Sequence, residues 1–196
     1  MKSWLAEDFP KIQALAKKAR ATLYFSDEAG VRSDFHAGTT WAAKGKTPVV
    51  EATGQRYGMN IISAISPRGD MRFMTVEGRM NAGKFIEFLK RLLHNAKRPV
   101  FLIVDGHPSH RARKVFEFVR KTKGKLRLFF LPPYSPELNP DELVWNHLKN
   151  HGVGKRIVKS REELKRVVIG HLRYLQKTPD LVRAFFRERH VRYVLA

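Results

Sequence analysis

Three features are absent or scarce in this 196-residue sequence, and each excludes a class of protein. There is no cysteine, which excludes disulfides and thiolate metal sites and fits a cytoplasmic protein. No stretch approaches the roughly 18 consecutive apolar residues of a membrane span, and the N-terminus lacks the apolar core of a signal peptide. Acidic residues number only 18 against 38 Lys and Arg, which gives a formal net charge of +20.

This charge makes a polyanion the expected partner, because each neutralised phosphate releases counterions. A membrane surface is the rival polyanion, but the basic residues are spread along the chain rather than gathered on one amphipathic helix. Nucleic acid is therefore favoured, and we expect no membrane partner. The candidates for phosphate contacts come from the densest basic stretches and are Arg111, Arg113, Lys114, Lys155, Arg156 and Lys159.

The spacing of apolar residues predicts a mixed sheet. Strands are expected first over 21–28, 57–65 and 71–76, with short strands or a hairpin within 29–50. A helix over 10–20 precedes these strands. After them, strands over 100–104 and 126–131 alternate with helices, which are expected over 81–93 and 109–122, from Pro140 onward and over 161–176, with a last segment from Pro179. This order predicts an α/β fold with about five strands and helices on both faces of the sheet.

The run from Leu131 to Trp145 is the most informative stretch, because prolines make it a rigid turn that leads into a helix. Asn139 suits the N-cap, Pro140 the first helical position, and Glu142 the third. Two interpretations remain open for Glu142: it closes a capping box with Asn139, or it is aimed at a fixed point beside the sheet. Asp141 is interpreted as a favourable charge at the helix N-terminus.

Two further acids are expected at the carboxyl ends of strands, where functional residues gather in α/β sheets. Asp27 is expected to end the first strand, and Asp105 follows the buried strand over 100–104. If these strands are neighbours, both acids converge with Glu142, and a divalent cation such as Mg²⁺ or Mn²⁺ would relieve the repulsion among them. Two such ions can activate a water or a 3′-hydroxyl for phosphoryl transfer.

Each of these residues also has a structural interpretation. Asp27 would then be a turn residue with Glu28 as the relevant acid, and Asp105 would only begin an Asp-Gly turn. His107 and His110 are either metal ligands or proton carriers, or they are structural histidines in that turn.

Three motifs in the sequence carry a family resemblance. They are FSDEAG at 25–30, VDGHPSH at 104–110, and LPPYSPELNPDE at 131–142 followed by Trp145. In this order they resemble the catalytic domain of DDE transposases, most closely bacterial insertion-sequence transposases related to the mariner elements. The third motif is the most specific, and the resemblance extends from about Trp4 to the C-terminus.

The resemblance implies an RNase H-like fold in which Asp27, Asp105 and Glu142 are the catalytic, metal-binding triad. It implies an endonuclease and polynucleotidyl transferase that uses Mg²⁺ or Mn²⁺, with two ions per site. Its substrates would be the inverted-repeat ends of a mobile element and target DNA, joined through a 3′-hydroxyl. His110 and Asn139 would support the triad, and the active complex would be a homodimer.

The expected organisation is one catalytic domain over 1–196, with an N-terminal helix over 1–20, a core over 21–150 and a basic helical extension over 151–196. Members of the family carry helix-turn-helix modules, for which there is no room before Asp27. We therefore expect a separate helix-turn-helix partner chain and a location in the prokaryotic cytoplasm, at the nucleoid. The alternatives are an RNase H-like nuclease for other nucleic acids and a non-catalytic DNA-binding remnant.

Overall fold

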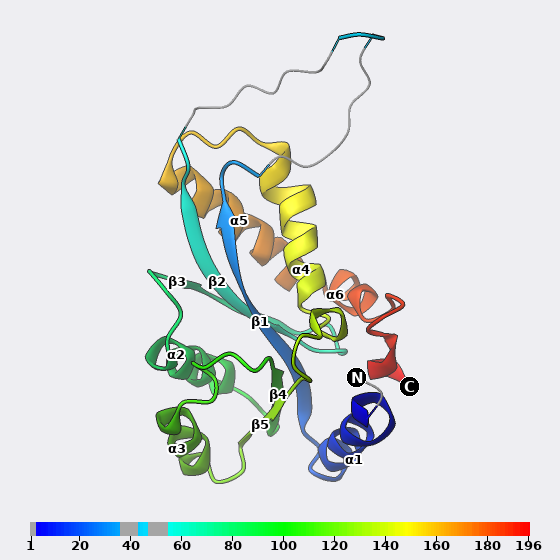
Figure 1. Ribbon diagram of the computed structural model, residues 1–196. Coiled ribbons are helices and arrows are strands. Elements are labelled where there is room, and N and C mark those ends of the chain that lie inside the picture. The colour runs from blue at the N-terminus through cyan, green and yellow to red at the C-terminus, as the bar shows by residue number, and fades with distance from the viewer. Residues whose placement is uncertain (1–2, 36–42, 47–54) are drawn as a thin grey trace.

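A five-stranded mixed sheet forms the centre of the protein in a computed structural model that describes residues 3–35, 43–46 and 55–196 (Figure 1). The strand order is β3-β2-β1-β4-β5. The bounds are β1 (Thr22–Arg32), β2 (Gly58–Ile65), β3 (Met71–Val76), β4 (Val100–Val104) and β5 (Leu126–Phe130). The first three strands pair antiparallel, whereas β4 pairs parallel with both β1 and β5, so the expected mixed α/β sheet is confirmed.

Helices are interspersed with these strands. The α-helices are α1 (Phe9–Lys18), α2 (Ala82–Leu93), α3 (Arg113–Lys121), α4 (Glu142–His147), α5 (Arg161–Gln176) and α6 (Pro179–Phe185). Shorter helical turns are η1 (Trp4–Asp8), η2 (Pro136–Leu138), η3 (Leu148–Gly152), η4 (Val153–Lys155) and η5 (Arg192–Leu195). None of the helices within the described ranges is both long and apolar enough to cross a bilayer.

Two hydrophobic cores lie on opposite faces of the sheet, because successive side chains of a strand point to opposite sides. Tyr24 belongs to the core under α2 and α3, whereas its neighbour Phe25 belongs to the core under α1, α4, α5 and α6. Ile62 and Ile61 divide in the same way on β2. All five residues of β4 are buried, as expected for a central parallel strand covered on both faces. Figure 1 shows helices on both sides of the sheet.

The first strand is longer than predicted, so Asp27 lies within it and not at its end. The parallel ladder with β4 runs from Thr22 to Phe25 and stops there. The antiparallel ladder with β2 continues through Asp27, opposite Ser63, as far as Arg32. Asp27 therefore lies just beyond the end of the pairing with β4, in the part of β1 that pairs with β2 alone. Much of the segment expected to hold short strands within 29–50 lies outside the described residues.

Two helices begin later than predicted. α3 starts at Arg113 rather than Ser109, because the intervening residues form a turn in which the His110 N–H donates to the His107 carbonyl at 2.9 Å. α4 starts at Glu142 rather than Pro140. Its first turn is instead closed by a bond from the Glu142 N–H to the Asn139 carbonyl, 3.2 Å long and one residue tighter than in an α-helix.

Candidate active site

One cavity of about 590 Å³ brings together the three acids singled out in the sequence. Asp27 comes from the middle of β1, Asp105 from the residue after β4, and Glu142 from the first turn of α4. The run 131–136 and Arg111 form other parts of its wall. A larger cavity of about 750 Å³ lies between the distal ends of β1–β3 and α5, but its acids, Glu77 and Glu162, share it with basic residues.

Asp27 is the most perturbed of the three acids. Burial raises the pKa of its carboxyl to about 8, with further contributions from the nearby charges of Glu142 and Glu28. One of its oxygens, Oδ2, accepts a hydrogen bond from Trp145 Nε1 at 3.1 Å, which opposes the rise in pKa. No salt bridge of the described residues joins Asp27 or Glu142 to a Lys or Arg. No basic side chain therefore pairs with either carboxyl group in the described part of the chain.

Residues just before α4 fasten it to β1. Asn139 Nδ2 donates to the Ser26 carbonyl at 3.2 Å, and the Asp27 N–H donates to Asp141 Oδ2 at 2.9 Å. The hydroxyl of Ser63 donates to the same Asp141 carboxyl, whose Oδ2 lies 2.7 Å away. Together with the Trp145 bond, these contacts hold the start of α4 against the part of β1 that carries Asp27.

Asp141 is therefore not the surface charge that we expected at a helix N-terminus. Its side chain is fully buried, and burial raises the pKa of its carboxyl well above the usual range, with the charge of Asp27 adding to the effect. Sequence reasoning missed this role. The available signal was Ser63, a polar residue inside the apolar strand β2, which needs a buried hydrogen-bond partner.

The capping-box interpretation of Glu142 is wrong. In a capping box the Glu142 side chain would accept from the Asn139 N–H, but that N–H donates to the Pro136 carbonyl at 2.8 Å. The carboxamide oxygen of Asn139 instead accepts from the Asp141 N–H at 3.2 Å. The Glu142 carboxylate remains on the wall of the cavity.

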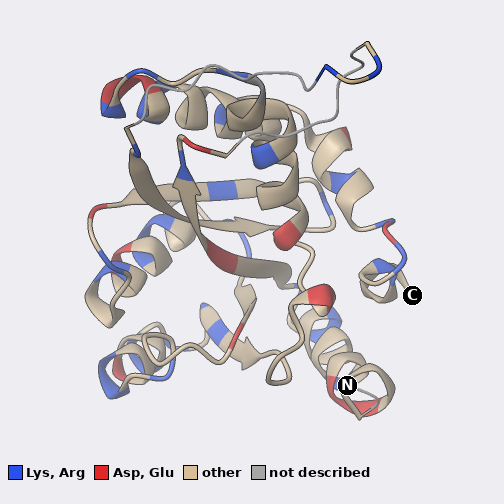
Figure 2. Ribbon diagram, turned by 45° about the horizontal axis from the view of Figure 1, so that its top comes forward, with Lys and Arg blue, Asp and Glu red and all other residues tan. Residues whose placement is uncertain are grey.

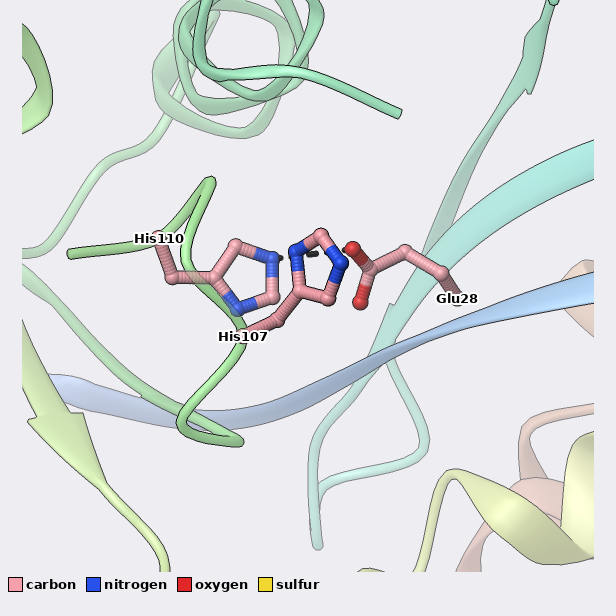
Figure 3. A group of neighbouring side chains, drawn as sticks. All are labelled: Glu28, His107 and His110. Atoms are coloured by element: carbon pink, nitrogen blue, oxygen red, sulfur yellow. Dashed lines mark ion pairs between the residues drawn. The ribbon is translucent and has the colours of Figure 1, made fainter. Parts of the chain in front are cut away.

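His110 lies between two carboxylates. Its Nδ1 is 2.9 Å from Asp105 Oδ1. Its Nε2 is 3.0 Å from Glu28 Oε1, the ion pair marked in Figure 3. Both ring nitrogens are buried, and each faces one carboxylate oxygen. Burial alone would lower the pKa of His110, but Asp105 and Glu28 raise it to about 9. In return, His110 holds the pKa of Asp105 below its usual range.

Glu28, His107 and His110 form a second group of possible metal ligands, with one ligand atom from each within 4.8 Å of the others. Figure 3 shows the rings of both histidines close to the Glu28 carboxylate. A protonated imidazole has no lone pair to offer a metal, and the raised pKa of His110 keeps it protonated at neutral pH. The group therefore fits charge pairing better than metal binding.

The candidate phosphate contacts divide between two regions. Arg111 lines the cavity, with its guanidinium 4.4 Å from the centre of the Phe130 ring. Arg113 and Lys114 are exposed on α3, where Arg113 pairs with Glu117. Figure 2 shows Lys and Arg on many of the peripheral helices and loops. The other candidates follow η3: Arg156 and Lys159 are exposed, and the side chain of Lys155 is outside the described part of the chain.

Comparisons with known proteins agree with this architecture. The family described as DDE superfamily endonuclease matches residues 22–165. A curated relative, the insertion element IS630 uncharacterized 39 kDa protein of Shigella sonnei, is 27% identical over 133 residues, which are 66% of this chain and 38% of the relative. The chain therefore spans about two fifths of the length of that relative.

Solved structures of Mos1 transposase share the fold. A paired-end complex with the left transposon end has a TM-score of 0.61 at 14% identity, over 89% of this chain and 59% of that chain. The catalytic domain of Mos1 mariner transposase has a TM-score of 0.59 at 13% identity, over 94% of this chain and 89% of that chain. A Mos1 paired-end complex with Mn has a TM-score of 0.57 at 15% identity, over 95% of this chain and 60% of that chain. The RNase H-like fold expected from the sequence is thereby confirmed.

Proposed function

Because this chain belongs to the DDE superfamily endonucleases, we propose that its carboxylate cavity is the active site of a metal-dependent transposase. The proposed reaction is cleavage of DNA at the ends of a mobile element, followed by transfer of the exposed 3′-hydroxyl to target DNA. Asp27, Asp105 and Glu142 are the proposed catalytic residues and metal ligands. The observation that carries the proposal is that these three acids, from three separate elements, line one cavity.

The donor set fits Mg²⁺ or Mn²⁺. Hard oxygen ligands suit these ions, and the carboxyl groups of Asp27 and Glu142, which pair with no Lys or Arg of the described chain, leave room for a divalent cation. The raised pKa of Asp27 supports this fit, because a buried carboxyl that is reluctant to ionise alone gains from a bound cation. We expect two ions per site. When bound, such ions would lower the pKa of the attacking water or 3′-hydroxyl and offset charge on the phosphate.

The residues of the chain itself orient this site. Trp145 fixes one oxygen of Asp27, and Asn139 and Asp141 hold β1 against the start of α4. This arrangement maintains the separation of Asp27 and Glu142 before substrate arrives, which is how a preorganised site gains rate. His110 keeps Asp105 ionised through the attraction between their charges.

DNA is the proposed partner, and Arg111 is the best placed of the basic candidates because it shares the cavity with the acids. Arg113, Lys114, Lys155, Arg156 and Lys159 are proposed to contact the backbone further away. We further propose a homodimer in the active complex, a helix-turn-helix partner that supplies end recognition, and action at the nucleoid in a prokaryotic cytoplasm. The Mos1 complexes with transposon ends support the choice of DNA ends as substrate.

The test is Mn²⁺-dependent nicking of DNA that carries the inverted repeats flanking the gene. We expect the unaltered protein to nick this DNA and Asp105→Asn to be inactive. Asp8→Asn, the same change at an exposed acid in η1, is the matched control and should retain activity. Equal nicking by the unaltered protein and Asp105→Asn would refute the assignment.

Two further outcomes would favour the alternatives. Hydrolysis of RNA–DNA hybrids without joining of DNA strands would indicate an RNase H-like nuclease. Salt-sensitive DNA binding without binding of Mg²⁺ or Mn²⁺ would indicate a non-catalytic remnant.

A further inference from the structure

Tyr134 extends fully into solvent at the rim of the carboxylate cavity. Its relative exposure is 101%, compared with 52% for Tyr174 on α5, so its ring lies against no other part of the described chain. Tyr134 is also among the residues that line the cavity of Asp27, Asp105 and Glu142. A large aromatic side chain that contributes nothing to the core is thus held beside the three acids.

The backbone at Tyr134 is in a conformation that residues with a side chain rarely adopt. Its φ is +53°, in the left-handed region that costs free energy for any residue other than glycine. Prolines at 132, 133 and 136 restrict the loop on either side. The next residue is anchored, since Ser135 is buried and its hydroxyl donates to the Pro133 carbonyl at 3.2 Å. The surrounding loop therefore imposes a strained conformation that keeps the ring exposed.

The surroundings of the ring fit one nucleotide better than a protein partner. A phosphate fits this cavity because the proposed metal ions would offset the charge of the carboxylates, and Arg111 in the same cavity offers a further cation. An aromatic ring with both faces in solvent offers a base a stacking surface, and stacking does not depend on which base is present. A phosphate near Arg111 and the acids would leave its neighbouring base within reach of the rim.

We propose that Tyr134 is a stacking platform for an unpaired base next to the phosphate that is cleaved or joined. This inference rests on the proposed function, because it places DNA in the cavity, and it deepens that function by assigning a contact to the base. The DNA strand would enter with this nucleotide unstacked from its neighbours. Because the ring alone provides the contact, the hydroxyl of Tyr134 is not required.

The test uses a DNA duplex with one unpaired 2-aminopurine at a strand end, in Ca²⁺ so that binding proceeds without cleavage. Stacking on Tyr134 should quench the fluorescence of 2-aminopurine in the unaltered protein and in Tyr134→Phe. Tyr134→Asn should lose the quenching and bind about tenfold more weakly, given the usual contribution of one stacked base. Asparagine tolerates the left-handed backbone, so this variant removes the ring without adding strain to the loop.

Tyr174→Ala is the matched control, an exposed tyrosine on α5 outside the cavity, and should quench as the unaltered protein does. Quenching and affinity that persist in Tyr134→Asn would overturn the stacking inference. The proposed function is tested separately, by nicking of the same DNA by the unaltered protein with Mn²⁺ in place of Ca²⁺. Quenching that depends on Tyr134 in a protein that never nicks DNA would uphold the base contact and refute the enzyme.

Discussion

The Asp141 carboxylate accepts a hydrogen bond from the backbone N–H of Asp27, so a buried acid at the start of α4 fixes the position of the strand opposite it. These two residues are 114 positions apart in the chain. The contact ties the first motif of the sequence to the third, which places the Asp27 side chain on the same cavity as Glu142.

Substitution of Asp141 should show whether its role is that of a hydrogen-bond acceptor. Asp141→Asn keeps an oxygen acceptor in the same place, so the free energy of unfolding should change by less than about 1 kcal/mol. Asp141→Leu leaves the Asp27 N–H and the Ser63 hydroxyl without their acceptor, and should lower the free energy of unfolding by about 1–3 kcal/mol. Denaturant unfolding of both variants measures the difference. An equal loss of unfolding free energy in Asp141→Asn and Asp141→Leu would contradict this role, because it would show that the charge of Asp141 stabilises the fold and its hydrogen bonds do not.

The pKa of Asp27 predicts how metal binding depends on pH. In the metal-free protein this pKa is raised to about 8 from 3.8, so the folded state favours the protonated acid and loses stability as pH rises through about 8. Binding of Mn²⁺ must displace that proton, and its affinity should rise about tenfold per pH unit below pH 8. Thermal unfolding with and without Mn²⁺ between pH 6.5 and 8.5 measures both effects. Asp27→Asn should abolish both, and a Mn²⁺ effect independent of pH would contradict the prediction.

His110 should stabilise the fold in a pH-dependent manner. Its folded-state pKa of about 9 lies above the ordinary value of 6.5, so its contribution is complete below pH 6.5 and is lost as pH rises through about 9. At pH 6, His110→Gln should lower the free energy of unfolding by about 1–2 kcal/mol, a range reduced because Asp105 is half exposed. Unfolding at a series of pH values should show the two proteins converging towards pH 10. A constant difference would mean that only the packing of the ring against Phe85 was lost.

Arg111 should contribute to DNA affinity through phosphate. Arg111→Ala should weaken binding equally for unrelated DNA sequences and reduce the slope of log affinity against log salt by about one. Lys18→Ala, at an exposed position on α1, is the control and should change neither quantity. Fluorescence anisotropy over a range of salt concentrations measures the slope. An unchanged slope for Arg111→Ala would show that its guanidinium serves only to pack on Phe130.

Local sequence patterns predicted the elements best where burial is regular. The bounds of β3, β4 and α5 are as expected, because a strand or helix that packs on a core repeats its apolar residues with the period of its backbone. The neighbouring positions of β1 and β4 did not follow from the pattern: they were the condition under which Asp27 and Asp105 would converge, and the structure meets it.

Contacts between distant residues were beyond such patterns. The length of β1 depends on pairing with β2 after β4 has ended, which no local signal near Asp27 reveals. The burial of Asp141 depends on Ser63 and on the backbone of β1. The left-handed backbone of Tyr134 was likewise invisible, because tyrosine is not a residue that normally signals it.

The pairing register of β1 has a consequence for insertions and deletions. Asp27 and Glu28 are adjacent, so they face opposite sides of the sheet, one towards the cavity and the other towards His110. A single residue inserted between Ser26 and Asp27 would reverse the sides of every residue after it that kept the ladder with β2. The inserted residue would then occupy the position on the cavity, and Asp27 would face the histidine. Copies of the gene that remain active should therefore lack insertions or deletions of one residue in this strand, even where side chains other than Asp27 vary.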